Sequence, residues 1–176
     1  MSAIFTRRSV RSFLEKPVEP EKMERILRAG MEAPSAHNRR PWEFIVITGE
    51  ADRMAIAEMS PYAKMVKTAP AVIGVCVDLS LGAPGDEEDA WWVQDLSAAT
   101  ENILLQITEE GLGGVWLGWY PAKERVRAFA ERFGFPPQVL PFSLVALGYP
   151  AKPVNAADRY DEGRVHYGAY GKKRPG

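Results

Sequence analysis

Apolar and polar residues alternate along the chain in patterns that predict both helices and strands. Between residues 20 and 33 the apolar positions return every third or fourth residue, which predicts an amphipathic helix with Pro20 in its first turn. A longer pattern of this kind covers residues 89–110, and its wide apolar stripe predicts a helix that is largely buried. Gly111 and Gly113 can end that helix, because glycine tolerates the left-handed backbone found at helix ends.

Four short apolar segments predict strands. Residues 44–48 and 71–77 are rich in β-branched residues and almost entirely apolar, which is typical of central strands covered on both faces. Residues 115–119 predict a third strand, and residues 142–147 predict a last strand in the core. We therefore expect a sheet whose strands lie mostly inside the molecule.

Shorter patterns predict the helical connections between these elements. Residues 52–59 and 62–67 predict two short helical connectors interrupted by Pro61. Pro121 begins another helix, which Gly134 closes.

Two segments are too polar to belong to a core. Residues 82–89 are acidic and contain Pro84, so they predict a surface loop. The tail, residues 151–176, carries aromatic and cationic side chains but no continuous apolar face. It therefore needs another surface to lie on, and an arm around a second subunit fits this requirement.

The order of the elements predicts the class of fold. Helices and strands alternate irregularly, without the repeated βαβ spacing of a doubly wound fold, so we expect an α+β sandwich with helices on both faces of a mixed sheet. The 176 residues, 46% of them hydrophobic, are enough for one domain with a substantial core, and we expect residues 1–176 to form it.

Charge and composition exclude several classes of protein. The formal net charge of −1 gives no global attraction to nucleic acid or to an anionic membrane. No apolar run approaches the roughly 20 residues that cross a bilayer, and Cys76 is the only cysteine, so we expect a cytoplasmic protein without disulfides. The first 12 residues share the Ser and Arg content of a mitochondrial presequence, but Glu15 and Glu19 follow at once, which speaks against that interpretation.

Side-chain catalysis and metal chemistry have little support in the sequence. There is no G-x-S-x-G motif, and Cys76 lies in an apolar strand, where a thiol usually packs and does not react. His37 and His166 lack the spacing of metal ligands, so no metal site is expected. The glycines at 111–114 end a helix, whereas a dinucleotide-binding motif must open one.

Two polar segments remain as candidates for function. The segment 7–11 contains three arginines and a serine, which suit a phosphate group, although a solvated basic N-terminus is an equal alternative. The segment 33–42 follows a helix and precedes a strand. Its Asn38 can donate and accept hydrogen bonds at the edge of a flavin ring, and the alternative is an ordinary loop with Trp42 in the core.

Together these segments resemble the nitroreductase family of FMN-dependent oxidoreductases, over nearly the whole chain. The resemblance rests on the order and spacing of several motifs: residues 7–11, Pro34-Ser35 with Asn38 and Pro41-Trp42, Asn102, residues 111–113 and 116–118, residues 147–150, and Arg159 with residues 165–167. It implies a mainly antiparallel central sheet with helices on both faces. It also implies a homodimer with an exchanged C-terminal arm and FMN at the subunit interface.

The resemblance implies roles for named residues. The FMN phosphate and pyrimidine edge would lie among Arg7, Arg8, Ser9, Arg11 and Arg159. Asn38 would meet the pyrimidine side of the flavin, and the other subunit would contribute Pro34, Ser35 and Ala36. The flavin ring would lie beside the backbone of Trp116, Leu117, Gly118 and Trp119, with an N–H near flavin N5.

The implied activity is transfer of electrons from NADH or NADPH through flavin N5 to a nitroaromatic, quinone or similar small acceptor, in a ping-pong cycle. No catalytic side chain is required, because the cofactor supplies the chemistry, and Arg11 is the candidate to stabilise the anionic reduced flavin. Alternatives on the same fold are reductive dehalogenation, enone reduction and flavin breakdown, or a redox sensor without turnover.

Several residues depart from the family pattern or have no settled role. Arg40 replaces a common Gln, His37 replaces a small residue and is expected to face solvent, and Trp119 stands where some members have glycine. Arg164 is either a phosphate ligand or a surface partner of Asp161 or Glu162. Trp91 and Trp92 are either lid residues or core anchors.

Overall fold

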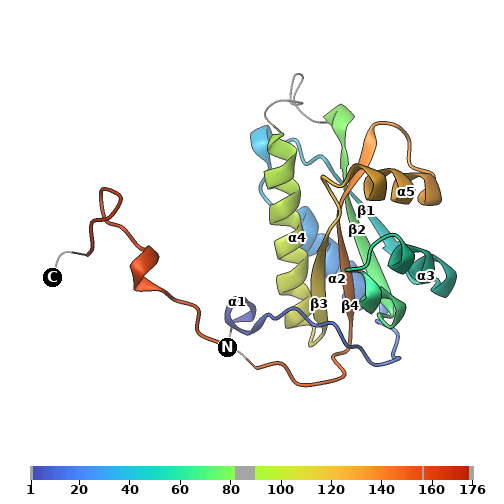
Figure 1. Ribbon diagram of the computed structural model, residues 1–176, viewed down its shortest axis with the longest axis horizontal. Coiled ribbons are helices and arrows are strands. Elements are labelled where there is room, and N and C mark those ends of the chain that lie inside the picture. The colour runs from blue at the N-terminus through green and yellow to red at the C-terminus, as the bar shows by residue number, and fades with distance from the viewer. Residues whose placement is uncertain (1, 82–89, 156, 175–176) are drawn as a thin grey trace.

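The computed structural model describes residues 2–81, 90–155 and 157–174. Its centre is an antiparallel sheet of four strands in the order β1-β2-β4-β3 (Figure 1). The strands are β1 Trp42–Ile47, β2 Ala71–Asp78, β3 Gly113–Gly118 and β4 Val139–Gly148. The α+β fold with a mainly antiparallel sheet is therefore confirmed.

Helices cover both faces of the sheet, as the sequence predicts. On one face lie α2 (Pro20–Met31) and the long α4 (Trp91–Glu109), and on the other lie α3 (Glu50–Glu58) and α5 (Lys123–Phe133) (Figure 1). The remaining helical elements are short: α1 Ala3–Thr6 and the 3-10 turns η1 Ala36–Asn38, η2 Lys64–Lys67, η3 Leu79–Leu81 and η4 Glu162–Arg164. The second predicted connector, residues 62–67, is thus a single 3-10 turn.

Strand β2 divides two hydrophobic cores, because successive side chains of a strand point to opposite faces. Ala71, Ile73, Val75 and Val77 pack toward α2 and α4, whereas Val72 packs toward α3 and α5. Each of these side chains is at most 1% exposed. Gly74 on the second face leaves room for its neighbours, since an added Cβ would lie 2.6 Å from Cγ2 of Ile45.

The expectation that residues 44–48 form a central strand is wrong. This segment forms β1, which pairs only with β2 among the described strands and so lies at an edge of the sheet. Its middle residues are only partly covered, and Val46 is 39% exposed. An apolar run predicts a strand, but its place in the sheet depends on pairing with distant segments. The predicted surface loop, residues 82–89, lies outside the described residues.

The C-terminal tail leaves the body of the molecule and extends away from it (Figure 1). Most of its described residues are exposed. Close to the body, the Ala151 N–H donates to the Ser12 carbonyl at 2.9 Å. As the sequence predicts, the described part of the tail has no apolar face that packs on its own protomer.

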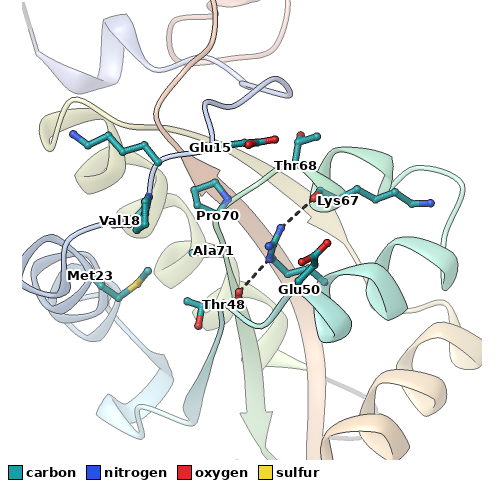
Figure 2. Close-up of a pocket in the computed structure, with 12 residues that line it drawn as sticks. Glu15, Val18, Met23, Thr48, Glu50, Lys67, Thr68, Pro70 and Ala71 are labelled. Atoms are coloured by element: carbon teal, nitrogen blue, oxygen red, sulfur yellow. Dashed lines mark hydrogen bonds between the residues drawn. The ribbon is translucent and has the colours of Figure 1, made fainter.

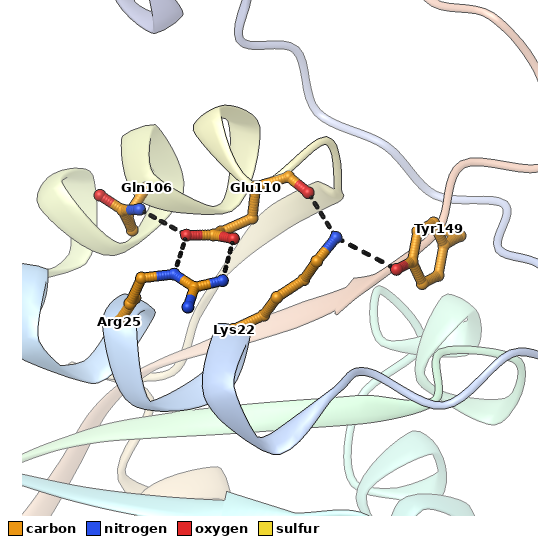
Figure 3. Close-up of polar contacts among 5 residues, drawn as sticks. All are labelled: Lys22, Arg25, Gln106, Glu110 and Tyr149. Atoms are coloured by element: carbon orange, nitrogen blue, oxygen red, sulfur yellow. Dashed lines mark hydrogen bonds and ion pairs between the residues drawn. The ribbon is translucent and has the colours of Figure 1, made fainter.

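A polar cluster fixes the end of α4, from which the chain enters β3 (Figure 3). Arg25 of α2 donates from Nε and Nη2 to the two carboxylate oxygens of Glu110, at 2.7 and 2.8 Å, and Gln106 donates to the same carboxylate at 2.8 Å. Lys22 donates to the Glu110 carbonyl at 2.8 Å and to the Tyr149 hydroxyl at 3.1 Å. The bond from Arg25 lowers the pKa of Glu110 to about 2.

Candidate functional site

The N-terminal segment lies along the outer edge of β3. Ser9 forms a parallel bridge with Gly114, and the Val10 N–H donates to the Gly114 carbonyl at 3.0 Å. Gly113 permits this close approach, because an added Cβ would lie only 2.5 Å from Cγ2 of Val10. The bridge brings the arginine segment beside the strand that the resemblance assigns to the flavin ring.

A cavity of about 410 Å³ opens where the two segments meet. It is lined by Arg11 and by the predicted strand residues Trp116, Leu117, Gly118 and Trp119. Three lining side chains are cationic, namely Arg11, Lys64 and Arg125, and none is a carboxylate among the residues described. In a chain with a net charge of −1, this cavity is a local concentration of positive charge.

The hydrogen-bond pattern of β3 turns backbone groups toward this edge. The Trp119 N–H donates to the Phe142 carbonyl at 3.2 Å, toward β4. Because the backbone groups of successive strand residues point to opposite sides, those of Trp116 and Gly118 point away from β4. The Gly114 carbonyl, which accepts from Val10, has this same outward direction. An outward N–H at Gly118 is therefore available beside Arg11.

A second cavity, of about 610 Å³, gathers Arg7, Arg8 and Arg159. Arg8 donates to the carbonyls of Phe5, Arg7, Asn155 and Ala157, so much of its guanidinium holds the tail against the N-terminal segment. Arg7 lies 3.2 Å from the Glu101 carboxylate. Arg7 and Arg159 lie beside the tail that Arg8 holds. Their two guanidinium groups can bind a phosphate, as the sequence predicts for these residues.

The loop before β1 is held in an uncommon backbone conformation. His37, Asn38 and Arg40 have φ values of 51°, 55° and 51°, in the left-handed region that non-glycine residues rarely adopt. The Ala36 N–H donates to the carboxylate of Asp95 at 2.9 Å, and the Arg40 N–H donates to the Ser35 hydroxyl at 2.9 Å. These bonds explain why the loop keeps this shape.

Pro34, Ser35, Ala36 and Asn38 line neither cavity of their own protomer. The structure therefore places Arg11 beside β3 in one cavity and Arg7 and Arg8 beside Arg159 of the tail in another, and the residues of this loop lie outside both. His37 is exposed, in agreement with the expectation that it faces solvent.

The structure also settles residues that the sequence left open. Trp92 is 6% exposed and makes an edge contact with Tyr120 at 4.8 Å between ring centroids, so it is a core anchor. Trp91 is 46% exposed. Arg164 pairs with Asp161 at 3.2 Å on the surface, the second of its two predicted roles.

The sequence interpretation missed one wall of the cavity beside β3. Residues 60–65, including Tyr62 and Lys64, line it together with the strand. The sequence marks this segment only as a connector between elements. A lysine beside an exposed tyrosine is no signal by itself, because the contact with Arg11 and β3 arises only in the folded chain.

A third cavity, of about 520 Å³, contains none of the predicted site residues (Figure 2). Its wall mixes acidic and basic side chains, including Glu15, Glu50 and Lys67. Arg53 spans this wall and donates to the backbone carbonyls of Thr48, Lys67 and Ala69, so its guanidinium holds these segments together. Figure 2 draws the bonds to Thr48 and Lys67 as dashed lines. The cavity therefore lacks the uniform charge found beside β3.

Two general features of the described chain bear on the kind of site. No helix within it is long and apolar enough to cross a membrane. Within the same residues, no group of three His, Cys, Asp or Glu side chains is placed to hold a metal ion.

Comparison with known proteins agrees with this fold. A protein of Methanothermobacter thermautotrophicus, provisionally named NADH dehydrogenase/NAD(P)H nitroreductase, is 43% identical over 94% of this chain and 85% of its own length. The structure of a provisionally named NADH oxidase from Clostridium acetobutylicum matches with a TM-score of 0.90 and 40% identity, over 96% of this chain and all of the other.

A further solved structure, a provisionally named nitroreductase from Desulfovibrio desulfuricans in complex with FMN, matches with a TM-score of 0.77 and 29% identity over 90% of each chain. The model of the nitroreductase family itself matches residues 4–64 and 58–149. The fold and site thus define an α+β protein with a cationic cavity at the edge of its sheet. The chain belongs to the nitroreductase family, and the resemblance noted in its sequence is confirmed.

Proposed function

We propose that the chain is an FMN-dependent oxidoreductase that passes electrons from NADH or NADPH to a small electron-poor acceptor, such as a nitroaromatic or a quinone. The observation that carries this proposal is the cavity beside β3, where cationic side chains meet outward backbone groups of the strand. The related structure in complex with FMN and the relative named as an NAD(P)H nitroreductase support the same cofactor and donor.

The residues of this chain fit the parts of FMN. Arg7 and Arg159 offer guanidinium groups to the phosphate, and Ser9 lies between Arg7 and Arg11 in the sequence. The outward N–H of Gly118 suits a hydrogen-bond acceptor on the flavin ring, and we propose flavin N5 as that acceptor. When bound, FMN supplies the acceptance and release of hydride.

The chain's own contribution is orientation and charge. Arg11 holds a permanent positive charge in the cavity, which stabilises negative charge on a bound ring. Lys64 adds a second cation to the same cavity. The proposed cycle is ping-pong, because donor and acceptor use the same exposed side of the site in turn.

We also propose that the site is completed in a homodimer, with residues 1–176 of each protomer as one domain and the tail as an arm on the partner. Phe5 is 66% exposed and Met31 is 51% exposed, so apolar surface is available for a second copy. The loop that carries Pro34, Ser35, Ala36 and Asn38 lines neither of the two arginine-containing cavities of its own protomer. We therefore propose that this loop reaches the site of the partner subunit. We also propose that the protein is cytoplasmic, acts on small molecules and binds no nucleic acid.

The test compares Arg11→Gln with Arg127→Gln, a control at an exposed arginine that pairs with Glu131 at 3.8 Å. FMN affinity is measured by fluorescence titration, and reduction by NADH and NADPH is followed anaerobically before a quinone is added. We expect Arg11→Gln to weaken FMN binding about tenfold or more, the equivalent of one lost charge-assisted hydrogen bond.

The control should bind FMN as the unmodified protein does. Unchanged FMN affinity in Arg11→Gln would contradict the proposed site. Reduction by NAD(P)H without reoxidation by any quinone or nitroaromatic would instead indicate a redox sensor or another reaction on the same fold.

A further inference from the structure

Trp119 and Arg125 tie the start of α5 to the end of β3 through reciprocal contacts. The indole Nε1–H of Trp119 donates to the backbone carbonyl of Arg125 at 2.7 Å. The Arg125 guanidinium returns across the same gap, donating from Nη1 to the Gly118 carbonyl at 3.1 Å. Its central carbon lies 5.8 Å from the centroid of the Trp119 ring, which is 1% exposed. The guanidinium is therefore supported by a rigid, buried platform.

Gly118 is the strand residue whose orientation most needs such support. It has no Cβ, and nothing lies within 4 Å of the place where one would be. Glycine therefore has more backbone freedom here than any other residue would have. Beyond it, the N–H groups of Trp119 and Tyr120 both donate to the Phe142 carbonyl, at 3.2 and 2.9 Å, so β4 anchors the chain on one side only.

The bond to the Gly118 carbonyl also orients the Gly118 N–H. In a β-strand the N–H and the carbonyl of one residue point to the same side. A donor that fixes the carbonyl on the outer edge of β3 therefore fixes the N–H on that edge. Arg125 itself lines the cavity with Arg11, and no ion pair with a carboxylate is found for it among the described residues.

We propose that Arg125 is a positioning residue for the electron-transfer site: it holds Gly118 so that its N–H faces the flavin ring. This inference rests on the proposed binding of FMN beside β3. Arg125 acts through the Gly118 backbone, and its charge is the third cation of the cavity. Arg125 acts together with Trp119, which stands where some family members have glycine.

The experiment compares Arg125→Met and Arg125→Lys with Arg127→Met as a control two residues further along the same helix. One readout uses the FMN-free protein: the ¹⁵N relaxation order parameter of the Gly118 amide. We expect Arg125→Met to lower it to a value typical of a flexible backbone, below about 0.6. Lysine should restore most of the order, because its ammonium can donate to the same carbonyl.

The second readout uses the FMN-loaded protein and separates the rate constant of flavin reduction at saturating NADH from the affinity for FMN. A misplaced hydrogen-bond donor at the reacting atoms lowers the rate constant more than it lowers the affinity for the cofactor. We therefore expect Arg125→Met to slow flavin reduction on the order of tenfold. FMN affinity should change by less than about threefold, because the arginines of segment 7–11 remain. Lysine should recover most of the rate.

Unchanged Gly118 order and unchanged reduction in Arg125→Met would overturn the inference. The inference would also be overturned if Arg125→Met and Arg125→Lys lowered the rate constant of reduction equally and in proportion to their loss of melting temperature. That result would mean that Arg125 only stabilises the fold. If the unmodified protein bound no FMN, the proposed function itself would be wrong. A defect confined to Arg125→Met would leave the proposed function intact and would concern only the role of Arg125.

Discussion

Replacement of Glu110 by Gln should destabilise the protein far more than the same replacement in a surface ion pair. The Glu110 side chain is only 10% exposed and accepts three hydrogen bonds, two from Arg25 and one from Gln106 (Figure 3). A Gln at this position has one acceptor oxygen, so one N–H of the guanidinium would face an NH₂ group. The matched control is Glu24→Gln, whose carboxylate pairs with Arg28 at 2.7 Å but is 63% exposed.

The geometry sets the size of the effect. Loss of one hydrogen bond between charged groups costs about 1.5–3 kcal/mol, and solvent around Arg25, which is 51% exposed, reduces this to about 2 kcal/mol. For a chain of this length, that loss lowers the melting temperature by about 4–8 °C. The exposed pair of Glu24 and Arg28 contributes about 0.3–0.5 kcal/mol, so its control should shift the melting temperature by less than about 2 °C.

The same prediction has a pH dependence. The bond from Arg25 holds the pKa of Glu110 at about 2 in the folded protein, below the ordinary value of 4.5. A lowered carboxylate pKa gives stability that is present above the ordinary value and is lost as the pH falls toward the folded value. The difference in free energy of unfolding between the unmodified protein and Glu110→Gln should therefore shrink between about pH 4.5 and pH 2.

Urea denaturation followed by circular dichroism, at pH 7 and at several values down to pH 3, measures this difference. Equal destabilisation by Glu110→Gln and Glu24→Gln at pH 7 would refute the reasoning. A difference that stayed constant down to pH 3 would show that the ionised carboxylate is not its source.

Three further predictions follow from particular contacts. Gly113→Ala should weaken FMN binding about tenfold or more, because its Cβ would lie 2.5 Å from Val10 and displace the arginine segment; unchanged affinity in a fluorescence titration would contradict this. Thr100→Val should lower the free energy of unfolding by about 1–3 kcal/mol, because the buried Ser143 hydroxyl loses its 3.0 Å partner. Adding Ser143→Ala should recover part of that loss in urea denaturation. Cys76 is 1% exposed, and burial raises the pKa of its thiol, so a thiol reagent should modify it only after unfolding; rapid modification of the native protein would contradict its packing.

Local patterns in the sequence were sufficient to predict most helices and strands, because their causes are local. The helix predicted for residues 20–33 is α2, Pro20–Met31, and Gly134 ends α5 with a φ of 67°. The position of β1 could not be predicted in this way. Its apolar residues are typical of a buried strand, but its place at the edge depends on which strands pair with it.

The site was predictable only in part, for a similar reason. The arginines of segment 7–11 and the strand that ends at Gly118 could be named from the sequence, through motifs shared with a family. Their contact depends on the bridge between Ser9 and Gly114, and the wall formed by residues 60–65 depends on the packing of η2 beside that edge. The role of Trp119 needed the structure too, because only there does its indole meet Arg125.

The most direct test of the account is the visible absorption spectrum of the purified protein, followed by release of any chromophore with acid and its identification by mass. The account predicts a flavin spectrum and released FMN, or uptake of added FMN by protein purified without it. A colourless protein that takes up no added FMN would contradict the account, and the cationic cavity beside β3 would then need another ligand.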